Sequence, residues 1–420
     1  MSQNNRNREH DVIIIGGGLA GLIAAAAAVN RGKKVLLMAK GAGTLIFGGG
    51  TVDLLGYITG GRVVANPQAG LQELADDHPY RKIGQQKVEE ALQFFLTLCS
   101  EEGYAYLGDV KQNYWLPTAA GTLKPSCFVP QTMDPTDFEK AEKVVVVGFN
   151  GLKDYYPQVL VKGLSKLPGY AKQYSIAWID PGFEAGRDVS ALDIARWLDT
   201  DAGQRDCIMQ MRQVVPESSV ALVPPVLGIH PNYQVARKLE QAAGYKLIET
   251  TGLPPAVIGF RLRTLLLNFL RNRGVTIMEQ AVVGKAIIDN GRCLAVTTTN
   301  VDRERSYYAK AFVLATGGIL GGGLSAEPSG VTEAIFHLAV TVPADPEAWG
   351  RHELFAAQGQ PFAKFGVAVD DSLRPVDDAG QVVLENVYIA GRSLAGYDYC
   401  LEKSGNGVAI ASGYQSGMSV

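Results

Sequence analysis

Cysteine is scarce in this chain and is never grouped. Its five cysteines are Cys99, Cys127, Cys207, Cys293 and Cys400, and no two of them have the C-x-x-C spacing of a zinc or iron–sulfur site. An odd number of scattered cysteines is typical of reduced thiols rather than of a disulfide framework. The sequence therefore predicts a cytoplasmic protein without a metal centre of its own.

Charged residues are also few, and no long basic run occurs. Charged residues make up 19% of the chain, and its net charge is −3, which argues against a nucleic-acid partner and against a polybasic membrane anchor. Residues 12–29 carry no charge, but three consecutive glycines and many alanines make this stretch unlike a membrane span or a signal peptide. We therefore expect that any membrane contact comes through a partner.

Glycine, in contrast, is abundant. The chain has 48 glycines among its 420 residues, above the usual ~7%. Close approach of the backbone to a large ligand is one cause of such an excess. The length also exceeds what one hydrophobic core normally serves, so two or more domains are expected.

A nucleotide-binding signature opens the chain. "DVIIIGGGLAGLIAAAAA" places Gly16, Gly18 and Gly21 directly after a buried strand at 12–15 and at the start of a helix at 19–30. In such a unit the first glycine permits the tight turn, the second lets a pyrophosphate approach, and the third allows helix and strand to pack closely. The helix N-terminus, at Leu19 and Ala20, would offer N–H donors to the anion.

The acid that normally grips a ribose hydroxyl about twenty residues later is missing. The second strand, at 35–38, is followed by Ala39 and Lys40. A hydrogen bond to a charged group contributes about 1.5–3 kcal/mol, whereas nanomolar binding needs about 12 kcal/mol. The loss is tolerable if other segments also hold the ligand, which favours a flavin over NAD.

Three further glycine-rich segments have the pattern expected of a flavin domain. "GTLIFGGG" would reach under the flavin ring, "VLATGG" would bring a strand end to the first glycine loop, and "YIAGRS" with "SGNGVAI" would place a helix N-terminus at the flavin pyrimidine. The expected cofactor-binding residues are Gly16, Gly18, Leu19, Ala20, Gly21, Lys40, Thr44, Gly48, Gly49, Gly50, Val283, Ala315, Thr316, Gly317, Gly391, Arg392, Gly407 and Val408.

The expected fold is α/β. A Rossmann-like, glutathione-reductase-type flavin domain would be assembled from residues 1–60, 251–340 and 341–420, with an α/β cap lobe inserted at 61–250. Within this plan, Ser190 would cap a helix, Pro231 would begin another that ends at Gly244, and Asn290-Gly291 would join two strands in a hairpin.

The order of these motifs resembles that of the fumarate-reductase-like flavoproteins, and more closely the B-subunit family of anaerobic (quinone-linked) glycerol-3-phosphate dehydrogenases. The resemblance rests on "GGGLAGL", "GGGTVDLL", "GTLKPS", "VVVVGFNGLKDY", "LPPAVIGFRL", "ATGGILGGGL" and "FGVAVDDSLRP", which extend over nearly the whole chain. It implies oxidation of sn-glycerol 3-phosphate to dihydroxyacetone phosphate. It also implies a catalytic FAD subunit and an iron–sulfur subunit as partners, with electrons passing to quinone.

Two points stay open at the level of sequence. The motifs favour FAD as the cofactor, whereas the resemblance implies FMN. The chain is a dehydrogenase subunit, a non-catalytic electron-relay or assembly subunit of the same complex, or another FAD-dependent oxidoreductase of the fumarate-reductase-like group.

Catalytic groups are poorly specified. Candidates for binding a substrate phosphate are Arg261, Arg263, Lys124 and Arg374, and for each a solvated surface position explains the residue equally well. The scattered histidines His78, His230, His337 and His352 fit satisfied or surface positions better than the role of a base.

Overall fold

The structure is a computed structural model that describes residues 10–184, 186–216, 219–300 and 303–420. The chain divides into two compact units. Unit 1 consists of Met1–Thr44, Asp53–Leu96 and Leu266–Val420, and unit 2 consists of Leu45–Val52 and Thr97–Leu265.

These boundaries differ from the expected lobe at 61–250. Residues 53–96 belong to unit 1, where they bond to the C-terminal segment: Gly56 N donates to Glu402 O at 2.8 Å, and Tyr80 Oη donates to Ser404 O at 3.3 Å. Residues 251–265 belong to unit 2, where Arg261 pairs with Glu249. The helices α4 (Gln85–Glu101) and α10 (Val257–Asn272) each begin in one unit and end in the other.

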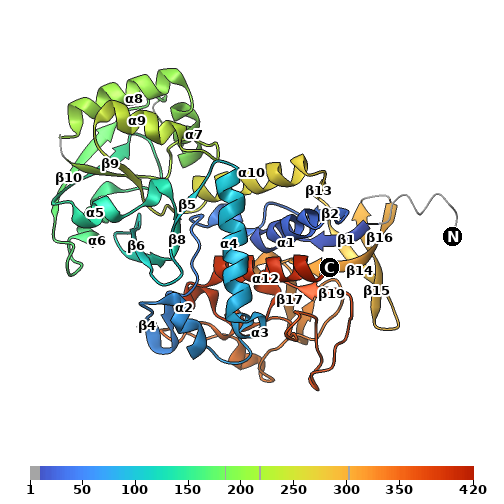
Figure 1. The fold of residues 1–420 in the computed structure, drawn as a ribbon. Coiled ribbons are helices and arrows are strands. Elements are labelled where there is room, and N and C mark those ends of the chain that lie inside the picture. Colours follow the sequence, from blue (N-terminus) through green and yellow to red (C-terminus); the bar gives the residue numbers. More distant parts are fainter. Residues whose placement is uncertain (1–9, 185, 217–218, 301–302) are drawn as a thin grey trace. The chain divides into compact units, whose positions relative to one another are not determined.

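Unit 1 is built on a mixed sheet in the order β13-β2-β1-β16-β15-β14, with β19 paired to β16 (Figure 1). β1, β2, β13, β16 and β19 run parallel, and β14 and β15 add an antiparallel meander. The bounds are β1 His10–Ile15, β2 Val35–Ala39, β13 Thr276–Glu279, β14 Val283–Asp289, β15 Arg292–Asn300, β16 Arg303–Leu314 and β19 Val387–Ile389.

The hairpin between β14 and β15 is confirmed. Asn290 and Gly291 have φ values of 46° and 74°, the left-handed conformation that a two-residue hairpin turn requires. Asp289 and Arg292 pair on either side of them.

Helices α1 (Leu19–Asn30) and α12 (Gly405–Ser419) pack closely in unit 1. A Cβ added at Gly413 would overlap Ala20 O, and one at Gly417 would overlap Ala24 O. The smaller elements of this unit are α2 Pro67–Gly70, α3 Pro79–Ile83, α11 Tyr399–Glu402, β3 Tyr57–Ile58, β4 Arg62–Val63, β17 Leu324–Glu327 and β18 Gly330–Glu333.

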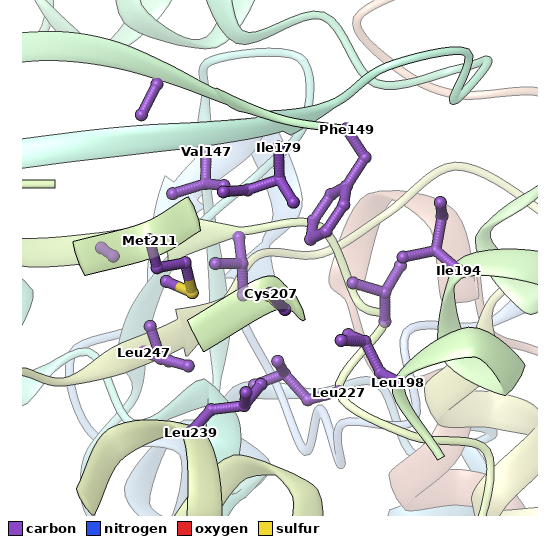
Figure 2. Close-up of a cluster of buried hydrophobic side chains, with 14 of the residues drawn as sticks. Val147, Phe149, Ile179, Ile194, Leu198, Cys207, Met211, Leu227, Leu239 and Leu247 are labelled. Atoms are coloured by element: carbon purple, nitrogen blue, oxygen red, sulfur yellow. The ribbon is translucent and has the colours of Figure 1, made fainter. Parts of the chain in front are cut away.

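Unit 2 is built on a parallel sheet in the order β10-β9-β11-β12. Apolar side chains from strands and helices fill its core, among them Val147, Phe149, Ile194, Met211 and Leu239 (Figure 2). The bounds are β5 Tyr106–Gly108, β6 Tyr114–Pro117, β7 Leu123–Ser126, β8 Phe128–Pro130, α5 Thr136–Lys140, β9 Lys143–Phe149, α6 Pro157–Leu164, β10 Gln173–Ile179, α7 Ala191–Leu198, α8 Asp201–Val214, β11 Val220–Val223, α9 Gln234–Ala243 and β12 Leu247–Glu249.

Two of the expected helix ends in unit 2 are confirmed and one is wrong. Ser190 caps α7 in a reciprocal capping box with Asp193, and Gly244 ends α9 in the left-handed conformation. α9, however, begins at Gln234 rather than at Pro231, because Asn232 Oδ1 accepts the Gln234 N–H in a turn that precedes the helix.

Within the described residues, no helix combines the length and the apolar character needed to cross a bilayer.

The packing of α1 against α12 can be tested at Gly413. Alanine favours a helix interior over glycine by about 1 kcal/mol, but at this position its Cβ would overlap Ala20 O. We expect Gly413→Ala to lower the free energy of unfolding by at least about 1 kcal/mol, the usual cost of overpacking. Urea denaturation followed by circular dichroism measures the change.

Gly405→Ala is the matched control. The nearest atom to a Cβ at Gly405 is Tyr399 Cβ, 3.4 Å away, so this variant should be as stable as the unaltered chain or more so. Equal stability of the two variants would show that the helices do not pack as described.

Candidate cofactor site

The ends of β1 and β16 meet at a contact that admits no side chain. Gly16 N donates to Met38 O and Ala315 N donates to Ile15 O, each at 2.8 Å. A Cβ on Gly16 would overlap Ala315 O, and one on Gly21 would overlap Gly16 O. These glycines therefore bring the first turn of α1 directly onto the sheet edge.

Gly18 lies in a different environment. Apart from its own chain neighbours, no heavy atom stands within 4 Å of a Cβ built on it. Gly18 is the N-cap of α1, in extended conformation and without a side-chain cap. The first backbone N–H that bonds back into the helix is that of Leu22, which donates to Gly18 O at 3.0 Å. The N–H groups of Leu19, Ala20 and Gly21 precede it, and a helix start of this kind attracts an anion. The site thus fits the phosphate end of a dinucleotide or flavin.

Ala39, where an acid was expected, is part of a packed contact. A Cβ on Gly17 would lie 2.7 Å from Ala39 Cβ, and Ala39 is buried. Its carbonyl accepts the Ala281 N–H at 3.0 Å. Lys40 follows and is exposed, and Val283 begins β14 two residues after Ala281. The structure therefore brings Lys40 and Val283 to the edge formed by the end of β2.

The loops after β16 and β19 lie against each other at the same edge. Thr316 Oγ1 and Ser393 Oγ are 3.5 Å apart, and a Cβ on Gly318 would lie 2.9 Å from Arg392 O. Gly391 has φ 67°, and a Cβ on it would overlap Ala20 Cβ at 2.8 Å. The expected residues Ala315–Gly317, Gly391 and Arg392 thus converge on the start of α1. Carboxyl ends of parallel strands beside a reversal of strand order are where ligands of α/β proteins bind.

Gly407 and Val408 do not face a ligand space, which corrects the expectation for them. Gly407 N donates to Asp53 O at 3.2 Å, and a Cβ on Gly407 would overlap Tyr80 Oη. Val408 is fully buried. The helix begins two residues earlier, at Gly405, and Gly405 is half-buried rather than enclosed.

His78 is a satisfied buried histidine that supports this helix start. Its Nδ1 accepts the Tyr80 N–H at 3.1 Å, so the ring proton lies on Nε2, 3.1 Å from Glu402 Oε2. Glu402 Oε2 also accepts the Ser404 hydroxyl at 2.8 Å. The other three histidine candidates, His230, His337 and His352, are exposed.

Gly48, Gly49 and Gly50 belong to unit 2, while Thr44 ends the first segment of unit 1. Gly50 has φ 67°, and a Cβ on it would overlap the Ile258 side chain. Its carbonyl accepts the Tyr106 hydroxyl at 2.6 Å. Lys124 Nζ donates to Thr51 Oγ1 at 2.7 Å. Lys124, a phosphate candidate, therefore holds the glycine loop. Tyr106 was missed because a tyrosine this far along the chain from Gly50 has no spacing signature.

Arg261 cannot bind a substrate phosphate, contrary to expectation. Its side chain is fully buried, Nη1 and Nη2 donate to the two oxygens of Glu249 at 2.7 and 2.9 Å, and Nε donates to Gly228 O at 2.8 Å. Burial would lower the pKa of Arg261, but the Glu249 carboxylate raises it above its ordinary value. The arginine is a permanent structural cation in unit 2.

The remaining phosphate candidates differ in their surroundings. Arg374 is held by Asp370 Oδ2, which accepts from Nε at 2.9 Å and from Nη2 at 2.8 Å. Arg263 is half-buried on α10 in unit 2.

The cysteines do not form a metal centre. Burial raises the pKa of the Cys207 and Cys293 thiols to about 12, so both stay protonated at neutral pH. Among the described residues, no group of three or more His, Cys, Asp or Glu side chains is placed to hold a metal ion.

Comparison with known proteins agrees with this geometry. Residues 11–408 match the family described as FAD binding domain. The B subunit of the anaerobic glycerol-3-phosphate dehydrogenase of Vibrio cholerae is 32% identical over 97% of this chain and 95% of its own length. The probable B subunit of the same enzyme in Halobacterium salinarum is 30% identical over 97% of both chains. The chain belongs to the FAD-binding domain family and, within it, to the anaerobic glycerol-3-phosphate dehydrogenase B subunits.

Membership in this family confirms the fold class and the cofactor class. The fold is α/β with a parallel-sheet core, and the protein is a flavin-dependent oxidoreductase. Among solved structures, the 3-ketosteroid delta1-dehydrogenase of Sterolibacterium denitrificans aligns with 98% of this chain and 99% of its own, at 12% identity and a TM-score of 0.46.

The open side of Gly18 gives a direct test of the phosphate position. Because no protein atom lies within 4 Å of a Cβ there, Gly18→Val should fold normally while its side chain occupies the space that a flavin phosphate needs. We expect loss of flavin from the purified chain, measured as absorbance at 450 nm per chain, with an unchanged circular dichroism spectrum. Flavin at the unaltered stoichiometry would show that the phosphate binds elsewhere.

Proposed function

We propose that this chain is the flavoprotein B subunit of an anaerobic glycerol-3-phosphate dehydrogenase. It takes part in oxidising sn-glycerol 3-phosphate to dihydroxyacetone phosphate, and its electrons pass through partner subunits to quinone. The observation that carries the proposal is the 32% identity to the Vibrio cholerae protein over 97% of this chain. The convergence of the first glycine loop with the ends of β16 and β19 supports it.

The residues of unit 1 divide the work of holding the cofactor. The N–H groups of Leu19, Ala20 and Gly21 would bind its phosphate end, and the loops at Ala315–Gly317 and Gly391 would line its ribityl side. A bound flavin supplies a two-electron acceptor. In unit 2, Tyr106 and Lys124 hold the loop at Gly50 and Thr51 in place.

The partners proposed are a catalytic FAD subunit and an iron–sulfur subunit. The relatives are named as subunits, which supports a complex. In the proposed complex the chain associates with the inner membrane peripherally, through these partners.

The flavin should be bound without a covalent link. "GTLIFGGG", the segment expected to lie under the ring, contains no histidine for such a bond. We expect all of the yellow colour of the purified chain to enter the supernatant on acid precipitation, and mass spectrometry of the supernatant to distinguish FAD from FMN. Colour that stays with the precipitate would contradict this expectation.

Activity should depend on the partners. We expect the isolated, flavin-loaded chain to reduce an artificial dye with sn-glycerol 3-phosphate slowly or not at all, and co-expression with the two partner subunits to restore at least about tenfold higher activity. The same co-expression with the Gly18→Val chain is the control. Full turnover by the isolated chain would show a self-sufficient enzyme, and no activity in the complex would overturn the proposed function.

A further inference from the structure

A hollow lies beside the carboxyl ends of β16 and β19 in unit 1. It is a small hollow, partly open to solvent, with a cavity volume of about 20 Å³. It is lined by the loop after β16, the turn at 361–365 and the segment after β19. The lining residues are Gly318, Ile319, Leu320, Phe362, Ala363, Phe365, Arg392 and Tyr399. Arg392 is the one charged residue in this lining, and the other side chains are apolar or aromatic.

The guanidinium of Arg392 stacks on an aromatic ring instead of pairing with an acid. Its Cζ lies 3.8 Å from the ring centroid of Tyr399. No hydrogen bond or ion pair of the Arg392 side chain occurs within the described part of the chain. Arg261 and Arg374, in contrast, use their N–H groups on Glu249 and Asp370.

Stacking holds the charge in place without consuming its donors. A guanidinium over a ring keeps its edge N–H groups available, and these match the geometry of phosphate or carboxylate. The half-buried position reduces competition from water. Burial raises the pKa of the Tyr399 hydroxyl, so the phenol stays protonated and can donate a hydrogen bond. The hollow therefore offers one positive charge and no negative one.

The hollow adjoins the cofactor edge, and neither Gly18 nor the first turn of α1 is among its lining residues. Gly391, the residue before Arg392, lies against Ala20 of α1. The backbone carbonyl of Arg392 lies against Gly318. A ligand held by the Arg392 guanidinium would thus lie next to the cofactor loops, while the N-terminus of α1 serves the cofactor's phosphate.

We propose that Arg392, held by Tyr399, binds the phosphate of a phosphomonoester substrate in this hollow. The proposal rests on the proposed function, which supplies sn-glycerol 3-phosphate as the phosphomonoester. The sequence motif had assigned Arg392 to cofactor binding because it follows Gly391. The proposal assigns it to substrate binding instead. The cofactor's own phosphate is the other source of the same chemistry, and the test separates the two.

The test compares flavin-loaded full-length chains. Binding of inorganic phosphate, sn-glycerol 3-phosphate and glycerol is measured by titration calorimetry for the unaltered chain, Arg392→Met, Arg392→Lys and the control Arg292→Met. Arg292 lies on β15, is half exposed and pairs with Glu385, so its variant makes the same change of charge away from the hollow. Flavin per chain is measured for each variant.

We expect the unaltered chain to bind both phosphate compounds but not glycerol. Loss of hydrogen bonds from a charged group should weaken phosphate binding at least about tenfold in Arg392→Met. Arg392→Lys should fall in between, and Arg292→Met should be unchanged. Flavin content should be equal in all four chains, and in the assembled complex Arg392→Met should raise KM more than it lowers kcat.

Three results would overturn the assignment: no phosphate binding by the unaltered chain, equal binding by Arg392→Met, or a loss of flavin in Arg392→Met, which would return the residue to the cofactor.

The proposed function can fail independently of this site assignment. If Arg392 binds phosphomonoesters but the complex does not oxidise sn-glycerol 3-phosphate, the site stands and the function is wrong. If the complex oxidises it with an unchanged KM in Arg392→Met, the function stands and the site is wrong.

Discussion

The contact between Gly16 and Ala315 is the constraint on which the cofactor site depends. It joins two strand ends that are almost 300 residues apart in the chain, and no side chain fits between them. Because β1 and β16 are fixed in this way, the first turn of α1 begins at the sheet edge with its N–H groups directed away from the strands. The tight contact at Gly16 thus goes together with the unoccupied space beside Gly18.

A second set of small residues carries this arrangement to the end of the chain. Gly413 and Gly417 allow α12 to touch the backbone of α1 at Ala20 and Ala24. Ser412 of the same helix accepts the Gly391 N–H at 2.9 Å. The last helix therefore positions the loop after β19 against the first turn of α1. From composition alone, the glycine excess suggests close approach of the backbone to a ligand. In the structure, some of these glycines instead allow two helices to pack closely.

Sequence reasoning succeeded where a local pattern determines a local structure. The strand–glycine–helix unit, the Asn290-Gly291 hairpin and the Ser190 capping box each need only neighbouring residues, and the family's order of motifs supplied the fold class. It failed where the partner is distant. An arginine on a helix has the same pattern whether it faces water or Glu249, and nothing near Gly407 shows that Tyr80 fills the space beside it. The boundaries of the two units differ from expectation for the same reason, since residues 53–96 bond to the distant C-terminal segment through Gly56 and Tyr80.

The three arginines show how the surroundings of one side chain decide its role. Arg261 is fully buried, so only a fully matched carboxylate makes its charge tolerable, and removing either partner would leave an uncompensated charge. Arg374 is half exposed, and its pairing with Asp370 organises a turn at little energetic cost. Arg392 has a ring where the other two have an acid. A ring orients the guanidinium without neutralising it, so the attraction for an anion is kept. For this reason Arg392, beside the cofactor edge, is the arginine of these three whose charge can act on a ligand. The sequence alone does not distinguish it from the other two.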